Sequence, residues 1–275
     1  MIYQEFALHQ EGSLPDSKLI VYIQDASPKL AIDKRPLVLI CPGGGYGYTS
    51  DREAEPIALS FLAMGYHAAV LRYSCAPAQY PTALLELAES IILIRKNADE
   101  WHINPDRIVV QGCSAGGHLA ACLGMFWDEA FLAEKMGLTA RQHAWLKPNG
   151  MILCYPVITT GEFAHKGSFE NLLGDRQEEL KEKLSLEKQV TKKTPKTFIW
   201  GTYTDASVPM ENSLLLVSAM RKADIPVEYH LYSKGAHGLA LANKLTQASD
   251  GRCIQEECAT WVPLAHTWME SLFRK

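Results

Sequence analysis

The sequence lacks three features that would each assign it to a particular class of protein. Its seven cysteines are odd in number and include no Cys-x-x-Cys pair, which argues against a disulfide framework and against a zinc site. No apolar run is long enough to cross a membrane. Lys and Arg number 27 against 31 Asp and Glu, with no basic cluster beyond Lys192-Lys193. Neither a nucleic acid nor a membrane is therefore an expected partner.

The first residues also lack the pattern of a signal peptide. Residues 1–6 contain an early acid and no basic region that leads into an apolar segment. Together with the scattered cysteines, this favours a reducing, cytoplasmic location. The sequence does not decide the oligomeric state, and a homo-oligomer stays open.

What the sequence does contain is an alternation of short apolar segments with longer amphipathic ones. The short segments predict strands at 19–24, 37–41, 67–73, 107–111, 150–155, 197–200 and 227–232. The longer segments predict helices at 53–64, 81–97, 115–125, 210–221 and 255–273. This alternation predicts an α/β fold, with a mostly parallel central sheet covered by helices on both faces. No linker or repeat divides the chain, so we expect a single domain over residues 1–275.

Two stretches, 126–146 and 159–186, do not fit the alternation. In α/β enzymes such insertions commonly cover the binding cleft, because the C-terminal ends of the strands open onto it. A helical excursion packed on the core is an equally good interpretation of each stretch.

The pentapeptide Gly112-Cys113-Ser114-Ala115-Gly116 has the form G-x-S-x-G. The pattern alone is weak, but here it follows a predicted strand and precedes a predicted helix, which is the setting that the motif requires. Ser114 would then lie at a helix N-terminus, where the N–H of Ala115 can stabilise a developing oxyanion. We therefore predict that Ser114 is a nucleophile. The alternative is an ordinary glycine-rich turn.

A second glycine cluster, Cys41-Pro42-Gly43-Gly44-Gly45-Tyr46, follows the strand predicted at 37–41. It has neither a Gly-Lys-Ser/Thr ending nor a G-x-G-x-x-G pattern, so it meets neither nucleotide-binding fingerprint. A glycine-rich loop after an early strand, combined with a nucleophile turn after a later one, matches a two-part oxyanion hole. Gly44 and Gly45 are the predicted backbone donors.

A serine nucleophile needs a base, and the base needs a carboxylate partner. His237 lies in a Gly-Ala-His-Gly loop after the last predicted strand, which satisfies the chain order serine, acid, histidine. Asp205 follows the strand predicted at 197–200, at the end where ligand-facing residues belong. The weaker competitors are His118 and His230 for the base, and Asp175 and Asp224 for the acid.

With these residues in place, the chain resembles the α/β-hydrolase fold esterases of the hormone-sensitive-lipase-like group, and more closely the acetyl esterase and acetyl-xylan or feruloyl esterase-like branch. The resemblance runs from about residue 35 to the C-terminus. Two departures are Pro42, where many relatives have histidine, and Thr202-Tyr203-Thr204, where a His-Gly pair is more usual. The motifs that carry the resemblance are 41–46, 72–74, 104–108, 112–118, 205–209 and the Gly-x-His-Gly around His237.

The resemblance implies hydrolysis of short acyl esters, with acetyl groups on sugars or xylan-derived oligosaccharides as the expected substrates. The triad and oxyanion hole require no metal and no organic cofactor. The rival interpretations are an arylformamidase or small serine peptidase, because the same groups cleave amides, and a ligand-binding protein on a hydrolase scaffold.

The positions of further residues beside the motifs suggest contacts with the substrate. Tyr46 and Arg52, with Tyr48 and Asp51, follow the oxyanion loop and could contact the alcohol part of a substrate. The alternative that we favour for Arg52 is an ion pair with Asp or Glu that fixes the loop. Trp127 could line the acyl or sugar pocket, although packing against the core is the commoner role of such aromatic residues.

Overall fold

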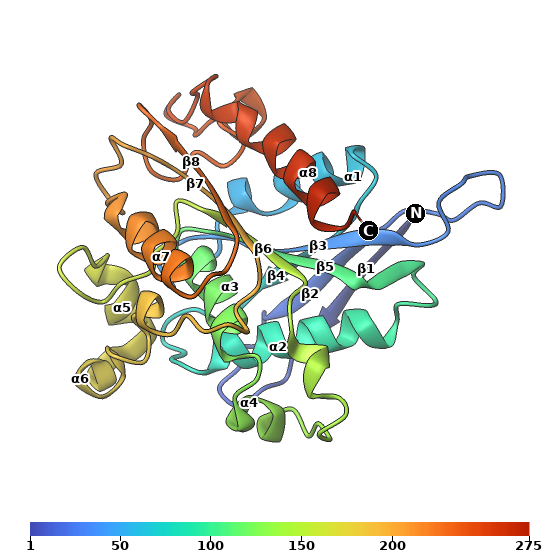
Figure 1. The fold of residues 1–275 in the computed structure, drawn as a ribbon, viewed down its shortest axis with the longest axis horizontal. Coiled ribbons are helices and arrows are strands. Elements are labelled where there is room, and N and C mark those ends of the chain that lie inside the picture. Colours follow the sequence, from blue (N-terminus) through green and yellow to red (C-terminus); the bar gives the residue numbers. More distant parts are fainter. Residues whose placement is uncertain (275) are drawn as a thin grey trace.

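The computed structural model describes residues 1–274, and its eight strands form one sheet (Figure 1). The strands are Ile2–Ala7 (β1), Lys18–Ile23 (β2), Arg35–Cys41 (β3), His67–Arg72 (β4), Ile103–Cys113 (β5), Gly150–Cys154 (β6), Thr197–Thr202 (β7) and Val227–Tyr232 (β8). Their order in the sheet is β1-β2-β4-β3-β5-β6-β7-β8. Strand β2 is antiparallel to both of its neighbours, and the pairs from β4 to β8 are parallel. The predicted, mostly parallel sheet is confirmed.

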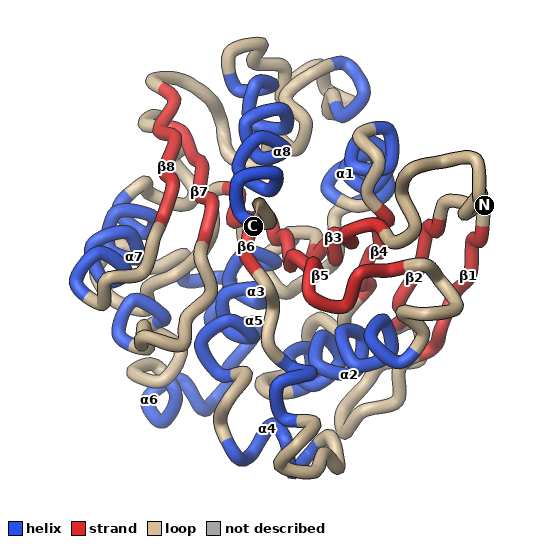
Figure 2. Tube along the Cα trace, turned by 45° about the vertical axis from the view of Figure 1, so that its right-hand side comes forward, coloured by secondary structure: helices blue, strands red, loops and turns tan. Residues whose placement is uncertain are grey.

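Helices cover both faces of this sheet, as the alternation predicts (Figure 2). Helices α1 and α8 pack over one face, and α2, α3 and α7 pack over the other. The helices are Glu55–Ala63 (α1), Thr82–Lys96 (α2), Ala115–Phe126 (α3), Ala130–Lys135 (α4), Lys166–Leu173 (α5), Gln177–Leu180 (α6), Glu211–Lys222 (α7) and Trp261–Leu272 (α8). Each face therefore has its own buried hydrophobic core, and the sheet separates the two.

The central strands are the ones that the sequence predicts best. Residues 37–41 of β3 are buried on both faces, as are 150–154 of β6, so these strands are continuous apolar runs. Strand β1 was not predicted, because it lies at the edge of the sheet, pairs only with β2 and is largely exposed. The last helix was predicted to begin at 255, but α8 begins at Trp261, after a short 3-10 turn at 258–260.

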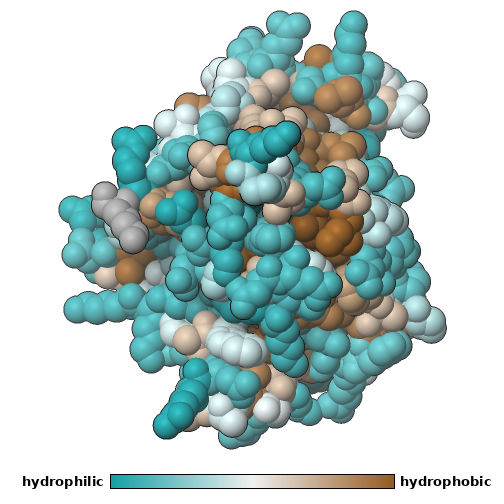
Figure 3. All heavy atoms as spheres, turned by 90° about the vertical axis from the view of Figure 1, so that its right-hand side faces the viewer, coloured by the Kyte–Doolittle hydropathy of each residue, from teal (hydrophilic) through white to brown (hydrophobic). Residues whose placement is uncertain are grey.

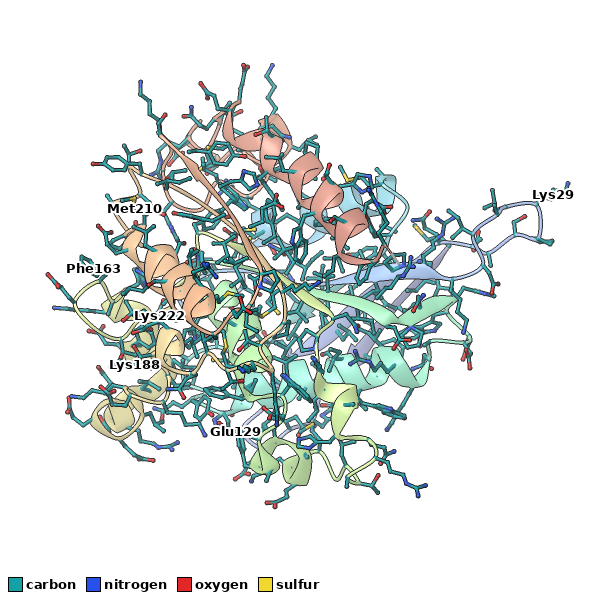
Figure 4. The ribbon with its side chains drawn as sticks, in the orientation of Figure 1. Lys29, Glu129, Phe163, Lys188, Met210 and Lys222 are labelled. Carbon is teal, nitrogen blue, oxygen red and sulfur yellow. The ribbon has the colours of Figure 1, made fainter. Side chains whose placement is uncertain are left out.

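The two insertions follow different strands but contact each other, since Lys183 of the second pairs with Glu129 of the first at 3.0 Å. Helix α3 is 12 residues long, so it carries the chain about 18 Å away from the serine turn before 126–146 begins. That first insertion forms α4 and packs against α2. The second, 159–186, forms α5 and α6. In Figure 4, Glu129 of the first insertion is labelled low in the view, and Phe163 of the second is labelled at the left.

One face of the molecule is mostly polar on its surface. Figure 3 shows a largely hydrophilic face, interrupted by smaller hydrophobic areas. Large apolar side chains exposed near the N-terminus include Ile2 and Tyr3 of β1. Among residues 1–274, no helix combines the length and the hydropathy that a bilayer crossing requires.

Candidate active site

The turn between β5 and α3 presents Ser114 at the C-terminal end of the sheet. Ser114 has φ of +54° and ψ of −119°, a backbone conformation that L-residues rarely adopt. The turn is possible because its glycines allow close backbone packing. A Cβ added to Gly112 would collide with the carbonyl oxygen of Gly116, and one added to Gly116 would collide with that of Cys41. The strained turn is thus packed both on itself and on the end of β3.

Main-chain hydrogen bonds hold Ser114 in this conformation. Its N–H donates to the carbonyl oxygen of Cys154 at 2.9 Å, and its own carbonyl oxygen accepts from the N–H of Val157 at 3.1 Å. The serine is only 6% exposed. The next strand, β6, therefore fixes the height of the serine above the sheet.

His237 and Asp205 reach this serine from the loops after β8 and β7. The Nε2 atom of His237 lies 2.7 Å from Ser114 Oγ, and its Nδ1 atom lies 2.7 Å from Asp205 Oδ2. The Asp205 side chain is 2% exposed and that of His237 is 21% exposed. The structure brings together the three residues that the chain order had selected.

The partners of His237 assign its tautomer. An ionised carboxylate only accepts hydrogen bonds, so Nδ1 carries the hydrogen and donates to Asp205. In the neutral ring Nε2 is then the acceptor, and the Ser114 hydroxyl donates to it. The other carboxylate oxygen of Asp205 accepts from the N–H groups of Ser207 and Val208, each at 2.9 Å. Asp205 is therefore fixed in place independently of the histidine.

The glycine loop after β3 lies beside the serine. Gly44 and Gly45 have φ of +130° and +62°. Neither N–H donates a hydrogen bond within residues 1–274, so both are free for a ligand. The Nδ2 group of Asn171 donates to the carbonyl oxygen of Gly45 at 2.9 Å, which orients that peptide from the second insertion. The N–H of Gly43 is already used, because it donates to Glu53 at 2.8 Å.

A pocket of roughly 460 Å³ surrounds these groups. No leucine, isoleucine, valine, methionine, phenylalanine or tryptophan of the described chain lines it. The second insertion contributes His165, Gly167 and Asn171, whereas 126–146 contributes no lining residue and packs against α2, which matches the second of its two interpretations. The pKa of His165 is lowered, mainly by its burial and secondly by the nearby His237. The lining residues are Gly44, Gly45, Tyr48, Ser50, Arg52, Glu53, Ser114, His165, Gly167, Asn171, Ser207, His237, Gly238, Ala248, Arg252 and Cys253.

Arg52 lines the pocket but makes no ion pair within residues 1–274, so the interaction that we favoured for it is not found. Its Nε donates to the carbonyl oxygen of Thr246 at 2.7 Å, and its Nη1 to that of Gly238 at 2.9 Å. The neighbouring Asp51 pairs with Arg72 instead, at 2.8 Å. Arg52 therefore ties the loop after β3 to the loop that carries His237.

Two residues that were expected to contact substrate lie elsewhere. Tyr46 is buried, and its hydroxyl lies 2.9 Å from Nδ1 of His118, because its φ of +58° turns the side chain toward the core. Trp127 follows α3 at the end remote from Ser114. Its Nε1 donates to the carbonyl oxygen of Lys193, and its ring lies under the ammonium of Lys147. Neither residue lines the pocket.

The two other histidines that were considered for the base have different partners. His118 is fully buried and contacts the carbonyl oxygen of Leu184 through Nε2, and His230 pairs with Glu228. Glu53, His165 and Asn171 were not among the predicted site residues, because an isolated Glu, His or Asn gives no local sequence pattern. Among residues 1–274, no cluster of His, Cys, Asp and Glu is placed to hold a metal ion.

The sheet is mostly parallel, and Ser114 lies on a strained strand-to-helix turn after β5, with an acid after β7 and a histidine after β8. This arrangement defines an α/β-hydrolase. Residues 24–220 match the family model BD-FAE, and the chain belongs to that family. It is 38% identical over 218 residues to endo-1,4-beta-xylanase B of Butyrivibrio fibrisolvens, covering 76% of this chain and 33% of that protein. It is 28% identical over 204 residues to an acetylxylan esterase of Xylanibacter ruminicola, covering 72% and 39%. The chain thus spans a third to two fifths of the length of these relatives.

Solved structures of similar length share the fold. The carboxylesterase Cest-2923 from Lactobacillus plantarum has a TM-score of 0.83 and 30% identity, with both chains covered completely. An acetyl ester-xyloside bifunctional hydrolase from Caldicellulosiruptor lactoaceticus has a TM-score of 0.79 and 36% identity, over 93% of this chain and 88% of that one. The predicted fold and the family resemblance are confirmed, and the names of these relatives support the expected class, a carboxylic ester hydrolase.

Proposed function

We propose that the chain is a serine carboxylesterase that hydrolyses short acyl esters, above all acetyl esters of sugars or xylan-derived oligosaccharides. The observation that carries this proposal is the continuous series of 2.7 Å contacts from Ser114 to His237 to Asp205. The unused N–H groups of Gly44 and Gly45 lie in the same pocket. A nucleophile, a base and oxyanion donors are the three groups that acyl transfer needs.

In the first half of the reaction, Ser114 Oγ attacks the ester carbonyl carbon while His237 Nε2 takes the hydroxyl proton. Asp205 stabilises the imidazolium that forms. The carbonyl oxygen becomes an oxyanion, which the N–H groups of Gly44, Gly45 and Ala115 would hold. When the tetrahedral intermediate collapses, the bond to the alcohol oxygen breaks and His237 gives its proton to the leaving alkoxide. An acyl-serine and a free alcohol result.

The second half uses the same groups in reverse. His237 takes a proton from a water molecule, whose oxygen attacks the acyl-serine carbonyl. The second oxyanion occupies the same site. Its collapse breaks the bond to Ser114 Oγ, which recovers the proton from His237, and the carboxylic acid leaves. The cycle consumes one ester and one water and needs no other reactant.

The pocket supports a small acyl group and a polar alcohol. Long fatty chains need an extended apolar lining, and none of the large aliphatic residues of the described chain lines this pocket. Its wall offers instead Asn171, Ser207 and Tyr48, the kinds of side chain that bind sugar hydroxyls. The names of the relatives agree, since they include an acetylxylan esterase and an acetyl ester-xyloside hydrolase.

The test compares Ser114→Ala with Ser90→Ala, a buried serine of α2 that does not line the pocket. Both variants are assayed on aryl acetate, aryl octanoate, acetylated xylo-oligosaccharide and formanilide. We expect the wild type and Ser90→Ala to favour the acetyl esters, and Ser114→Ala to lose at least about a thousandfold in kcat. Retained activity in Ser114→Ala, or a preference for octanoate or formanilide, would contradict the proposal.

A further inference from the structure

A buried carboxylate lies between the two loops that carry the polar groups of the site. Glu53 is 3% exposed and forms no ion pair with any Lys, Arg or His of residues 1–274. Its Oε2 accepts from the N–H of Gly43 at 2.8 Å, and its Oε1 accepts from the hydroxyl of Tyr155 at 2.8 Å. Burying a charge without a counter-charge is unfavourable, so the position calls for an explanation.

Tyr155 continues the connection to the histidine loop. Its hydroxyl accepts from the N–H of Ala240 at 2.9 Å, three residues after His237. Its ring packs edge-on against the imidazole of His237, with the centroids 5.2 Å apart. A continuous path of hydrogen bonds thus runs from Gly43 through Glu53 and Tyr155 to Ala240.

The packing around Glu53 leaves little freedom at the glycine loop. A Cβ added to Gly43 would lie 2.6 Å from Glu53 Oε2 and 3.0 Å from Ser114 Cβ. The carboxylate therefore packs directly against Gly43, the residue before Gly44. A carboxylate suits this place because both of its oxygens accept, and each meets a donor. Glutamine would present one donor where an acceptor is needed.

We propose that Glu53 is a positioning residue that holds the glycine loop, residues 43–45, in a fixed position relative to His237. The inference rests on the proposed ester hydrolysis, in which the N–H groups of Gly44 and Gly45 hold the oxyanion while His237 moves the proton. Glu53 touches no reacting atom in this scheme. It acts through Gly43 on one side and through Tyr155 on the other.

The test measures kcat and KM of Glu53→Gln on an aryl acetate, and the rate at which a fluorophosphonate labels Ser114. Misplacing the donors weakens the transition state more than substrate binding, so we expect kcat to fall about 10- to 100-fold with KM changed less than about threefold. The labelling rate should fall in parallel, because the phosphonate oxygen uses the same donors.

The matched control is Glu86→Gln. Glu86 of α2 is also fully buried and has no ion pair with any cation of residues 1–274. It accepts from the N–H and hydroxyl of Ser74 and from the hydroxyl of Ser13. It does not line the pocket. We expect Glu86→Gln to lower the Tm but to keep kcat. Equal losses of kcat in the two variants, or an unchanged kcat in Glu53→Gln, would overturn the proposal.

Tyr155→Phe keeps the ring against His237 but removes the hydroxyl, and with it both the hydrogen bond to Glu53 and the one from Ala240. We expect about a three- to tenfold loss of kcat, and little further loss when it is combined with Glu53→Gln, since both changes break one path. Should Glu53→Gln not fold, Tyr155→Phe decides the matter, and an unchanged kcat and labelling rate would overturn the proposal. A wild type that is labelled but cleaves no acetyl ester would refute only the substrate assignment, because the labelling rates still test Glu53. A wild type that takes no label would overturn both.

Discussion

The serine side and the histidine side of the site are held in place by different means. On the serine side the backbone packs against backbone, and Gly112 and Gly116 leave no room for a side-chain atom. On the histidine side, side chains reach across to loop peptides. The hydroxyls of Thr202 and Thr204 donate to the carbonyl oxygen of Gly235, and Arg52 donates to that of Gly238.

This difference predicts two kinds of failure. An added atom on the serine side has to displace main-chain atoms that belong to the sheet, so it lowers the free energy of unfolding. A changed polar group on the histidine side leaves the sheet intact but alters the alignment of the imidazole, so it lowers kcat. Substitutions chosen on each side can therefore separate stability from catalysis.

Among the substitutions that compare the two sides, the largest effect on the rate is expected for Asp205→Asn. The asparagine oxygen can still accept from Ser207 and Val208, so the loop keeps its conformation. Its amide group then faces Nδ1 of His237, where a donor meets a donor and the ring is driven to the wrong tautomer. We expect kcat to fall about 10³- to 10⁴-fold with the Tm within a few degrees of wild type. Steady-state kinetics and thermal melts together check this result.

A large fall in Tm with Asp205→Asn would contradict the difference described between the two sides, because it would show that the acid is needed for stability. A kcat within tenfold of wild type would instead remove Asp205 from the proposed triad.

Gly116→Ala tests the serine side. The new methyl group collides with the carbonyl oxygens of Cys41 and Pro42, which are backbone atoms at the end of β3. We expect a loss of about 3 kcal/mol or more in the free energy of unfolding. Gly201→Ala in β7 is the matched control, since its added Cβ would have no neighbour closer than 3.9 Å and its φ is not positive. Its Tm should equal or exceed that of wild type.

Denaturant unfolding of both variants measures the contrast directly. If Gly116→Ala is as stable as Gly201→Ala, the serine turn is less tightly packed than its contacts indicate, and the two sides of the site do not differ in the way described above.

The same difference explains which parts of the site the sequence could predict. Ser114, His237 and Asp205 each follow a strand with a recognisable apolar pattern, and their order along the chain limits the choice. Glu53 has no such pattern, because its two partners are 10 and 102 residues away in the chain. Its role depends on tertiary contacts that no local spacing encodes.

The mistaken assignments have a related cause. Tyr46 directly follows the glycines that were predicted to form the oxyanion hole, but its φ is positive and its side chain is buried in the core. Proximity in sequence to a motif therefore did not predict proximity to the ligand. Strand β1 was missed for another reason, since an exposed edge strand carries no continuous apolar run.

The smallest effect concerns the pH dependence of stability on the serine side. His118 of α3 is fully buried, and burial lowers its pKa to about 4. In the unfolded chain a histidine has a pKa near 6.5. Between pH 6.5 and 4, His118 is therefore protonated in the unfolded chain but mostly neutral in the folded protein. Stability therefore falls as the pH falls through this window, by up to about 1.4 kcal/mol per pH unit for one histidine. His67, whose pKa burial also lowers to about 4, contributes with the same sign.

His118→Gln sharpens this test, because glutamine can accept from Tyr46 or donate to the Leu184 carbonyl without titrating. Thermal melts at pH 7.5, 6 and 5 should show a lower Tm than wild type at pH 7.5 but a smaller decline toward pH 5. The decline should persist in part, since His67 is still present. If Tm declines with pH as steeply in His118→Gln as in wild type, other groups take up the protons on unfolding. His118 would then not make the serine side sensitive to acid.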